Sequence, residues 1–403
     1  MSSQPTTSVA APESAGPAPE AGKYANRIDR FLSILPTSNG SDLHLTVGSP
    51  PIMRIDGELE RSRHRPLKDS DYFNLVRPIT PPALWEKFLA AGDVDFAYQM
   101  GKDARFRVNL FRQERGLAAV FRLIPWRIPT VEELGLPNAV SGLASAERGL
   151  VLVTGPTGSG KSTTLAAILD RVNKRFSHHV ITIEDPVEFV HTNQKSIFTQ
   201  REIGNDVMTF AEGVKAAIRE DPDCLLVGEM RDLETIRMAL SAAETGLLVF
   251  ATLHTNSAAK AVDRIIDAFP ATEQDQIRTV LAESLRAVVA QQLLKKKEKG
   301  RVAAYEILLG STALANAIRE GKTNLINNQI QTGKSKGMIS MDQSLGELVR
   351  TGVVEPNEAL DRALDKETFK TMLAALPEGR VQSGATSPGS GPAPAVHPPA
   401  AAR

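Results

Sequence analysis

GPTGSGKST, residues 155–163, contains a complete G-x-x-x-x-G-K-[ST] pattern. An apolar segment, Leu150–Thr154, precedes it, and a helix-forming segment, Ser162–Lys174, follows it. In this strand–loop–helix context the glycines let backbone N–H groups turn inward around phosphate, and the start of the helix adds its dipole. The pattern therefore predicts a nucleoside triphosphate site in an α/β domain.

Two residues of this loop are expected to have different roles in binding the nucleotide and its metal ion. The Lys161 ammonium is expected to reach the β- and γ-phosphates, and the Ser162 hydroxyl is expected to bind Mg²⁺. All nine residues are predicted to bind ATP: Gly155, Pro156, Thr157, Gly158, Ser159, Gly160, Lys161, Ser162 and Thr163.

Polar side chains follow three further apolar segments, at the points where strands are expected to end. Glu229 follows Cys224–Val227, and Glu184 and Asp185 follow Ile181–Ile183. Carboxyl ends of parallel strands meet at one edge of a sheet, where a Mg²⁺-dependent phosphate site needs acids. Glu229 is expected either to bind the metal, directly or through water, or to polarise the attacking water.

The choice of general base stays open between Glu184 and Glu229, with Asp185 beside the first. His254 follows a fourth apolar segment, Leu248–Leu253, and is a candidate sensor of the γ-phosphate.

Apolar segments alternate with helical ones from Gly149 to about Leu253, which predicts a mostly parallel, doubly wound sheet. Before it, a helix over Tyr24–Leu35 and five alternating segments predict a small α+β domain. Beyond Pro270 the pattern predicts helices to about Leu376. The five segments are 42–47, 52–55, 95–98, 105–111 and 118–123.

The predicted organisation has five parts. Residues 1–22 and 377–403 are rich in Pro, Ala and Ser, and are expected to be disordered tails. Residues 23–124 form the N-terminal domain, 125–148 a linker with the start of the next domain, and 149–376 the ATPase domain with its C-terminal helices.

Composition excludes several classes of protein. The 403 residues carry 47 basic and 47 acidic side chains and 5% aromatic residues, which argues against a basic, base-stacking nucleic-acid channel. The single cysteine, Cys224, excludes an intrachain disulfide framework and a multi-cysteine zinc cage. No apolar run reaches the length of a transmembrane helix, and the first 22 residues do not resemble a signal peptide.

Taken in order, four segments resemble the secretion ATPases of type II and type IV machines: GPTGSGKST, ITIEDPVEF, LLVGEMRD and ATLHTNSA. The similarity is closer to the PilT-like type IV pilus retraction ATPases and covers about residues 24–375. It includes SDLHL, PPIMRIDGEL, FRVNLFRQERG and QTGKSKGMISMDQSL.

This resemblance implies a homohexameric motor, with a PAS-like N-terminal domain and a RecA-like P-loop ATPase domain, that powers pilus retraction and twitching motility. ATP and Mg²⁺ would bind between the domains, with Arg107 and Arg122 reaching toward the γ-phosphate and Arg112 and Arg115 as weaker candidates. It further implies a cytoplasmic protein, held peripherally at the inner membrane by a pilus platform protein, with no nucleic-acid partner.

Three departures from the family pattern bear on whether the chain resembles the retraction or the extension ATPases. One cysteine cannot form the four-cysteine zinc element of many extension ATPases, which favours retraction. Leu247 stands where the family usually has a first histidine, so that His254 would act alone. Ala315, in the segment 313–320, replaces a usual arginine of a motif linked to retraction.

The sequence alone is also compatible with other functions. The chain would otherwise be a nucleotide-gated accessory subunit of another pilus ATPase with weak or no hydrolysis, or a secretion or DNA translocase motor. A small-molecule kinase lacks an obvious acceptor site.

Overall fold

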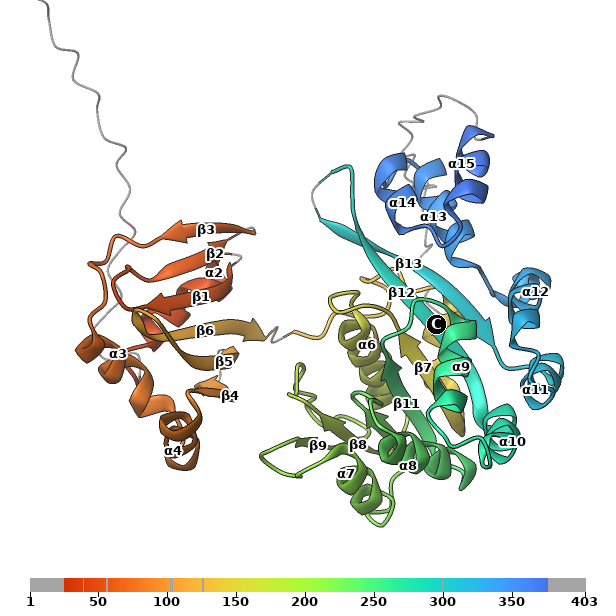
Figure 1. Ribbon diagram of the computed structural model, residues 1–403, viewed down its shortest axis with the longest axis horizontal. Helices are drawn as coiled ribbons and strands as arrows, with labels where there is room; N and C mark the ends of the chain where they lie inside the picture. The colour runs from red at the N-terminus through yellow and green to blue at the C-terminus, as the bar shows by residue number, and fades with distance from the viewer. Residues whose placement is uncertain are drawn as a thin grey trace, which may run out of the picture.

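The computed structural model describes residues 25–375 except 39, 56, 102–103, 125–126 and 299, so both predicted tails lie outside the described residues. Two β-sheets organise this part of the chain, each with its own hydrophobic core (Figure 1). The overall class, a mixed α/β protein with an antiparallel N-terminal sheet and a mixed second sheet, agrees with the prediction.

The N-terminal sheet is antiparallel throughout, in the order β3-β2-β1-β6-β5-β4. Five of its strands coincide with the five predicted segments, and β3 was not predicted. Along β5, Phe106, Val108 and Leu110 are buried, so that Arg105 and Arg107 emerge on the opposite face. The strands are β1 Gly40–Thr46, β2 Ile52–Ile55, β3 Glu58–Arg61, β4 Asp93–Met100, β5 Ala104–Gln113 and β6 Gly116–Ile124.

Short helices accompany this sheet. The described part of the predicted helix over 24–35 is two four-residue helices, and Pro36 lies inside the second instead of ending it. Pro36 is tolerated because a first-turn N–H has no partner within a helix. The helices are α1 Asp29–Leu32, α2 Ile34–Thr37, α3 Asp69–Val76, η1 Arg77–Ile79 and α4 Pro82–Ala91.

The second sheet has the order β13-β12-β7-β11-β10-β8-β9. All neighbouring strands are parallel except β12 and β13, which form an antiparallel hairpin. The strands are β7 Gly149–Thr154, β8 His179–Glu184, β9 Ile197–Glu202, β10 Cys224–Val227, β11 Leu248–Leu253, β12 Leu285–Lys295 and β13 Arg301–Leu309.

Helices cover both faces of this sheet, as a doubly wound fold requires. Leu150, Leu152 and Val249 pack on one face with α7–α10, while Val151, Val153 and Phe250 pack on the other with α6. The central strands are apolar on both faces for this reason. The helices are α5 Asn138–Ser141, η2 Gly142–Ser145, α6 Lys161–Arg175, α7 Phe210–Ala217, α8 Leu233–Glu244, α9 Ala258–Asp267 and α10 Gln274–Ser284.

The prediction that the chain is helical from Pro270 to Leu376 was wrong for the β12–β13 hairpin. Its two strands extend the sheet beside β7, and Val288 and Val289 are fully buried on opposite faces. A buried strand is a continuous apolar run, which periodicity alone does not separate from a buried helix. Strand β9 was also not predicted.

Several of the C-terminal helices pack on this hairpin, while α11 packs against α10. Met341, Leu345 and Phe369 form a separate core with Ala290 and Ala304. In α11 the predicted apolar stripe is buried at Leu314, Ala317 and Ile318, but Ala313 is exposed. The elements are α11 Thr312–Arg319, η3 Thr323–Leu325, α12 Ile326–Thr332, η4 Lys334–Lys336, α13 Met341–Arg350, α14 Pro356–Arg362 and α15 Lys366–Ala374. Among the described residues, no helix combines the length and hydrophobicity needed to cross a membrane.

Candidate nucleotide site

The loop 155–160 joins β7 to α6 at the carboxyl edge of the second sheet. Gly155, Gly158 and Gly160 all have positive φ angles, of 146°, 79° and 89°. A Cβ atom on Gly155 would lie 2.3 Å from the Gln291 carbonyl oxygen, so only glycine fits there. The loop therefore has the tight backbone path that a phosphate cradle needs.

Lys161 begins α6, and its side chain folds back over the loop. Its Nζ donates hydrogen bonds to the carbonyl oxygens of Gly155, at 2.8 Å, and Pro156, at 3.1 Å. Burial lowers the pKa of Lys161, against the opposing charges of Glu229 and Glu188. A phosphate group would offer this ammonium stronger, charge-assisted partners than two carbonyls.

Gln291, on β12, supports the loop and was not predicted from the sequence. Its Nε2 donates to the Ser159 carbonyl at 2.7 Å, and its Oε1 accepts from the Thr164 hydroxyl at 2.8 Å. The side chain is 3% exposed. A glutamine inside an apolar run was the available signal, because buried amides need partners.

Glu229 lies at the end of β10, facing the loop's lysine. One carboxylate oxygen is 2.6 Å from Arg231 Nε and 2.9 Å from His254 Nε2. Burial by itself would raise the pKa of Glu229, but the hydrogen bond from Arg231 and the charges of His254, Arg231 and Lys161 outweigh it. The pKa therefore lies below its ordinary value, and Glu229 stays ionised. Two predicted residues, Glu229 and His254, are thus in direct contact.

Glu184 ends β8 in a different environment. Its Oε1 accepts from Thr182 Oγ1 at 2.8 Å and from Gln200 Nε2 at 3.3 Å. Burial raises the pKa of Glu184 to about 7 in spite of these bonds. A carboxyl group with such a pKa exchanges protons near neutral pH, which suits a general base.

Ser162 and Glu184 line one small cavity between α6 and the sheet, about 30 Å³ in volume. This space is enough for a single water molecule. Phe189, Leu226 and Thr252 are among the other residues that line it. The proposed Mg²⁺ ligand and the candidate base thus share a space of the size a water needs.

Four arginines of the N-terminal domain were candidates for the γ-phosphate. Arg107 and Arg122 are cross-strand neighbours, but Arg107 lies 3.7 Å from Asp95 and Arg122 lies 2.9 Å from Asp42. Neither forms an ion pair or hydrogen bond with residues 155–163. Arg112 donates to the Leu89 carbonyl, and Arg115 is exposed in the β5–β6 turn. Their role at the phosphate stays a prediction.

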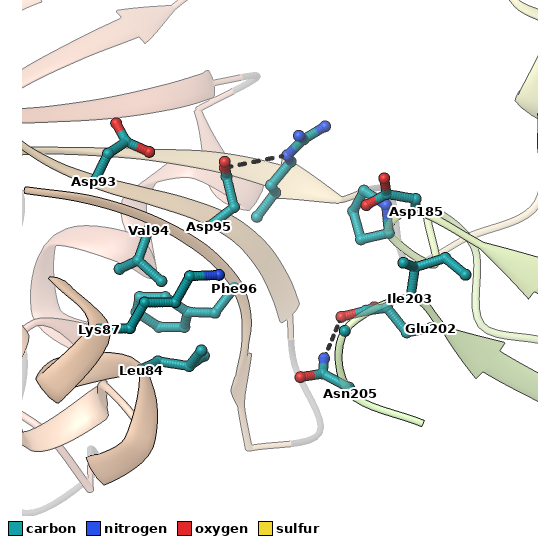
Figure 2. A pocket seen from close by; sticks show the side chains of 13 residues that line it. Leu84, Lys87, Asp93, Val94, Asp95, Phe96, Asp185, Glu202, Ile203 and Asn205 are labelled. Atoms are coloured by element: carbon teal, nitrogen blue, oxygen red, sulfur yellow. Dashed lines mark hydrogen bonds and ion pairs between the residues drawn. The ribbon is translucent and has the colours of Figure 1, made fainter. Parts of the chain in front are cut away.

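A cavity of about 280 Å³ lies between the two domains (Figure 2). Lys87, Asp95 and Arg107 line it from the N-terminal domain, and Asp185 and Glu202 line it from the second. Arg107 and the described segment that follows Glu184 thus face the same space, although no hydrogen bond or ion pair joins them.

The donors at the loop also suit Mg²⁺. The cation prefers oxygen ligands and usually takes only one or two from protein, with phosphates and waters completing its shell. The Ser162 hydroxyl and the ionised Glu229 carboxylate are such donors. Among the described residues, no cluster of three or more His, Cys, Asp or Glu side chains could hold a metal ion by itself.

Comparison with known proteins matches residues 54–361 to the family model described as Type II/IV secretion system protein. The chain is 48% identical to the type IV pilus retraction ATPase PilT of Pseudomonas aeruginosa over 342 residues, covering 85% of this chain and 99% of that relative. It is also 48% identical to a twitching motility protein of Neisseria gonorrhoeae, covering 79% of this chain and 86% of the relative.

Among solved structures, the chain resembles a crystal structure of the pilus retraction motor PilT with bound ADP. The TM-score is 0.81 at 42% sequence identity, and the match covers 86% of this chain and 99% of that one. The two-sheet architecture described above is therefore shared with a nucleotide-binding motor over nearly its whole length.

Proposed function

The chain belongs to the Type II/IV secretion system protein family and, within it, to the PilT-like ATPases, and from this premise we propose that it hydrolyses ATP to drive pilus retraction. The observation that carries the proposal is the convergence of the phosphate loop, Glu229 and Glu184 at one edge of the sheet. In this proposal residues 23–124 are a PAS-like domain and residues 149–376 a RecA-like domain with C-terminal helices, and residues 125–148 hold the linker and the start of the ATPase domain.

The phosphate loop would bind the β- and γ-phosphates of ATP. Lys161 exchanges its bonds to the Gly155 and Pro156 carbonyls for phosphate oxygens, and the loop's N–H groups supply further donors. Gln291 keeps the loop in this shape from the strand behind it. All nine residues of 155–163 are assigned to nucleotide binding on this basis.

Glu184 is the better of the two candidate bases. Its pKa of about 7 lets it accept a proton from a water near neutral pH, and it lines the same small cavity as Ser162. Glu229 is ionised and already engaged by Arg231 and His254, which suits a role in holding charge. His254 would then report the state of the γ-phosphate to Glu229.

Mg²⁺ would be held by the Ser162 hydroxyl and, directly or through water, by Glu229, where it would neutralise charge on the phosphates. Arg107 and Arg122 would leave Asp95 and Asp42 when the two domains close on ATP. An arginine that arrives only on closure stabilises the charge of the transition state and couples hydrolysis to domain movement.

For the assembly and its place in the cell, we propose a homohexamer in the cytoplasm that acts on a pilus platform protein of the inner membrane. The family assignment supports these proposals. The association with the membrane would be peripheral and through that partner, and no nucleic acid takes part.

The direct test is Mg²⁺-dependent ATPase activity of the purified protein, with its oligomeric mass measured in the same sample. We expect a hexamer whose turnover falls by at least a hundredfold in Lys161→Ala, while Lys174→Ala, on the last turn of the same helix, retains it. ATP binding without turnover would contradict the motor and favour a nucleotide-gated accessory subunit.

A further inference from the structure

Arg105 forms an ion pair that links the two domains. Its guanidinium lies 3.0 Å from the carboxylate of Glu202, and no other ion pair or hydrogen bond links residues 25–124 to residues 149–375 in the described part of the chain. The hydrophobic cores are also separate. Among the described residues, this pair is therefore the specific polar link between the two domains.

Glu202 is buried and Arg105 is partly buried, whereas most surface ion pairs are exposed on both sides. The Glu202 side chain is 7% exposed and the Arg105 side chain 23% exposed. An exposed pair contributes little, but removing one partner of a buried pair leaves the other charge without compensation. Removing either side chain of this pair should therefore measurably weaken the docking of the two domains.

Glu202 also holds the segment that follows Glu184. The oxygen that accepts from Arg105, Oε2, also accepts from the Val187 backbone N–H at 3.1 Å. Glu202 ends β9 directly beside Glu184, its partner in the β8–β9 register. One carboxylate thus connects the N-terminal domain to the turn that begins at the candidate base.

We propose that Arg105 and Glu202 form a positioning pair, through which the docked N-terminal domain fixes the turn 185–187 and with it the orientation of Glu184. The proposal rests on the function proposed above, and it assigns a role to two residues outside the phosphate loop. Arg105 acts through Glu202 and Val187 and does not itself touch the nucleotide.

Three readouts test it in the full chain. Cysteines placed at Glu60 on β3 and Glu244 on α8, both exposed, can carry spin labels because the native Cys224 is buried. With labelled chains diluted into unlabelled protein, we expect a narrow interdomain distance distribution that broadens in Arg105→Ala. Amide exchange in the peptide spanning 184–189 should accelerate in the same variant.

The third readout is steady-state kinetics. Arg105→Ala should lower kcat at least tenfold with KM changed less than twofold, and should move the acid limb of the kcat–pH profile to lower pH as Glu184 gains access to water. Arg105→Lys, which keeps the charge, should recover a large part of kcat. Glu202→Gln should behave like Arg105→Ala, and the double variant should be no worse than either single one.

Arg61→Ala, an exposed arginine on β3, is the matched control and should change none of these. Unchanged distances and amide exchange in both Arg105→Ala and Glu202→Gln would overturn the proposal. So would broadened distances with kcat and its pH limb intact, because the pair would then only tether the domain. An inactive wild type would refute the proposed function, while distances and exchange would still decide whether the pair holds the turn.

Discussion

Glu184 and Glu229 lie near the same loop, but their surroundings move their pKa values in opposite directions. Burial raises the pKa of Glu184, whereas Arg231, His254 and Lys161 together lower that of Glu229. Pairs of acids separated in this way commonly divide the tasks of proton transfer and charge stabilisation. The sequence did not decide which acid has which role. The raised pKa of Glu184 favours proton transfer for this residue.

The pH dependence of turnover follows from this assignment. A general base must be deprotonated, so kcat should rise with pH through an apparent pKa near 7, the value for Glu184. Glu184→Gln cannot accept a proton, and we expect a loss of at least a hundredfold in kcat with ATP affinity retained. Measuring kcat from pH 5.5 to 9 checks both.

Asp185→Asn is the control for this prediction, because Asp185 is adjacent and exposed. It should keep the acid limb. If the residual activity of Glu184→Gln still falls with an apparent pKa near 7, then a group other than Glu184 causes the acid limb of the kcat–pH profile.

At the level of single elements, β12 connects the sheet to the phosphate loop. Gln291 points from it to Ser159 and Thr164, while the next residue, Gln292, donates to the Arg362 carbonyl among the C-terminal helices. Successive residues of a strand face opposite sides, so neighbouring glutamines serve different parts of the molecule.

Replacing Gln291 by Leu should weaken ATP binding. The change leaves the Ser159 carbonyl and the Thr164 hydroxyl without these partners, at a cost of about 1–3 kcal/mol in general. If the loop relaxes to recover that cost, KM for ATP should rise about tenfold, since 1.4 kcal/mol is a factor of ten.

The matched control for this change is Gln292→Leu, which should affect stability but leave KM near the wild-type value. Equal effects of the two substitutions on KM would argue that Gln291 acts only through the general stability of the hairpin.

Strand β13 anchors two helices through a single buried acid. Glu306 is 3% exposed, and its two oxygens accept from the first N–H groups of α9 and α13, on Ala258 and Met341. Glu306→Ala leaves both N–H groups unpaired, so we expect a loss of about 2–4 kcal/mol in the free energy of unfolding. Urea denaturation measures it, with the exposed Glu298→Ala as the control.

The pH dependence of this loss has a definite sign. Burial raises the pKa of Glu306 above its ordinary value of 4.5. A carboxyl with a raised pKa in the folded state contributes stability that is fully present below its unfolded pKa and is lost as pH rises through the folded value. The cost of Glu306→Ala should therefore be larger at pH 5 than at pH 8. An equal or larger cost at pH 8 would contradict this.

How far the sequence predicts these elements depends on their pattern. Five of the six strands of the N-terminal sheet alternate in pattern, and the loop 155–163 has a specific motif, so these were predicted. Strand β3 is exposed along its whole length and has no such alternation. The β12–β13 hairpin is buried on both sides, and its apolar runs read equally well as helices. The ion pairs of Arg107 and Arg122 follow from strand register and pairing, which single segments do not specify.

In the described part of the chain, each domain has its own core, and the ion pair between Arg105 and Glu202 links the two domains. Domains connected in this way are expected to move relative to one another. The phosphate loop and the N-terminal arginines are therefore brought together only by closure, either within one chain or between neighbouring copies in a ring.

The structure favours closure within one chain, because Arg107 and Asp185 of the same chain already line one cavity. Mixing Lys161→Ala subunits with Arg107→Ala subunits tests this. If arginine and loop act within one chain, every site in a mixed ring lacks one of them, and activity should not exceed that of the separate variants. If they act between chains, an intact loop of one variant can meet an intact arginine of the other. In a random equal mixture, a subunit has an intact loop with a probability of about one half, and its neighbour has an intact Arg107 with the same probability. Activity should then recover to about a quarter of wild type. Such recovery, measured as ATPase rate after subunit exchange, would show that the arginines belong to the neighbour's site, as heterologous ring interfaces allow.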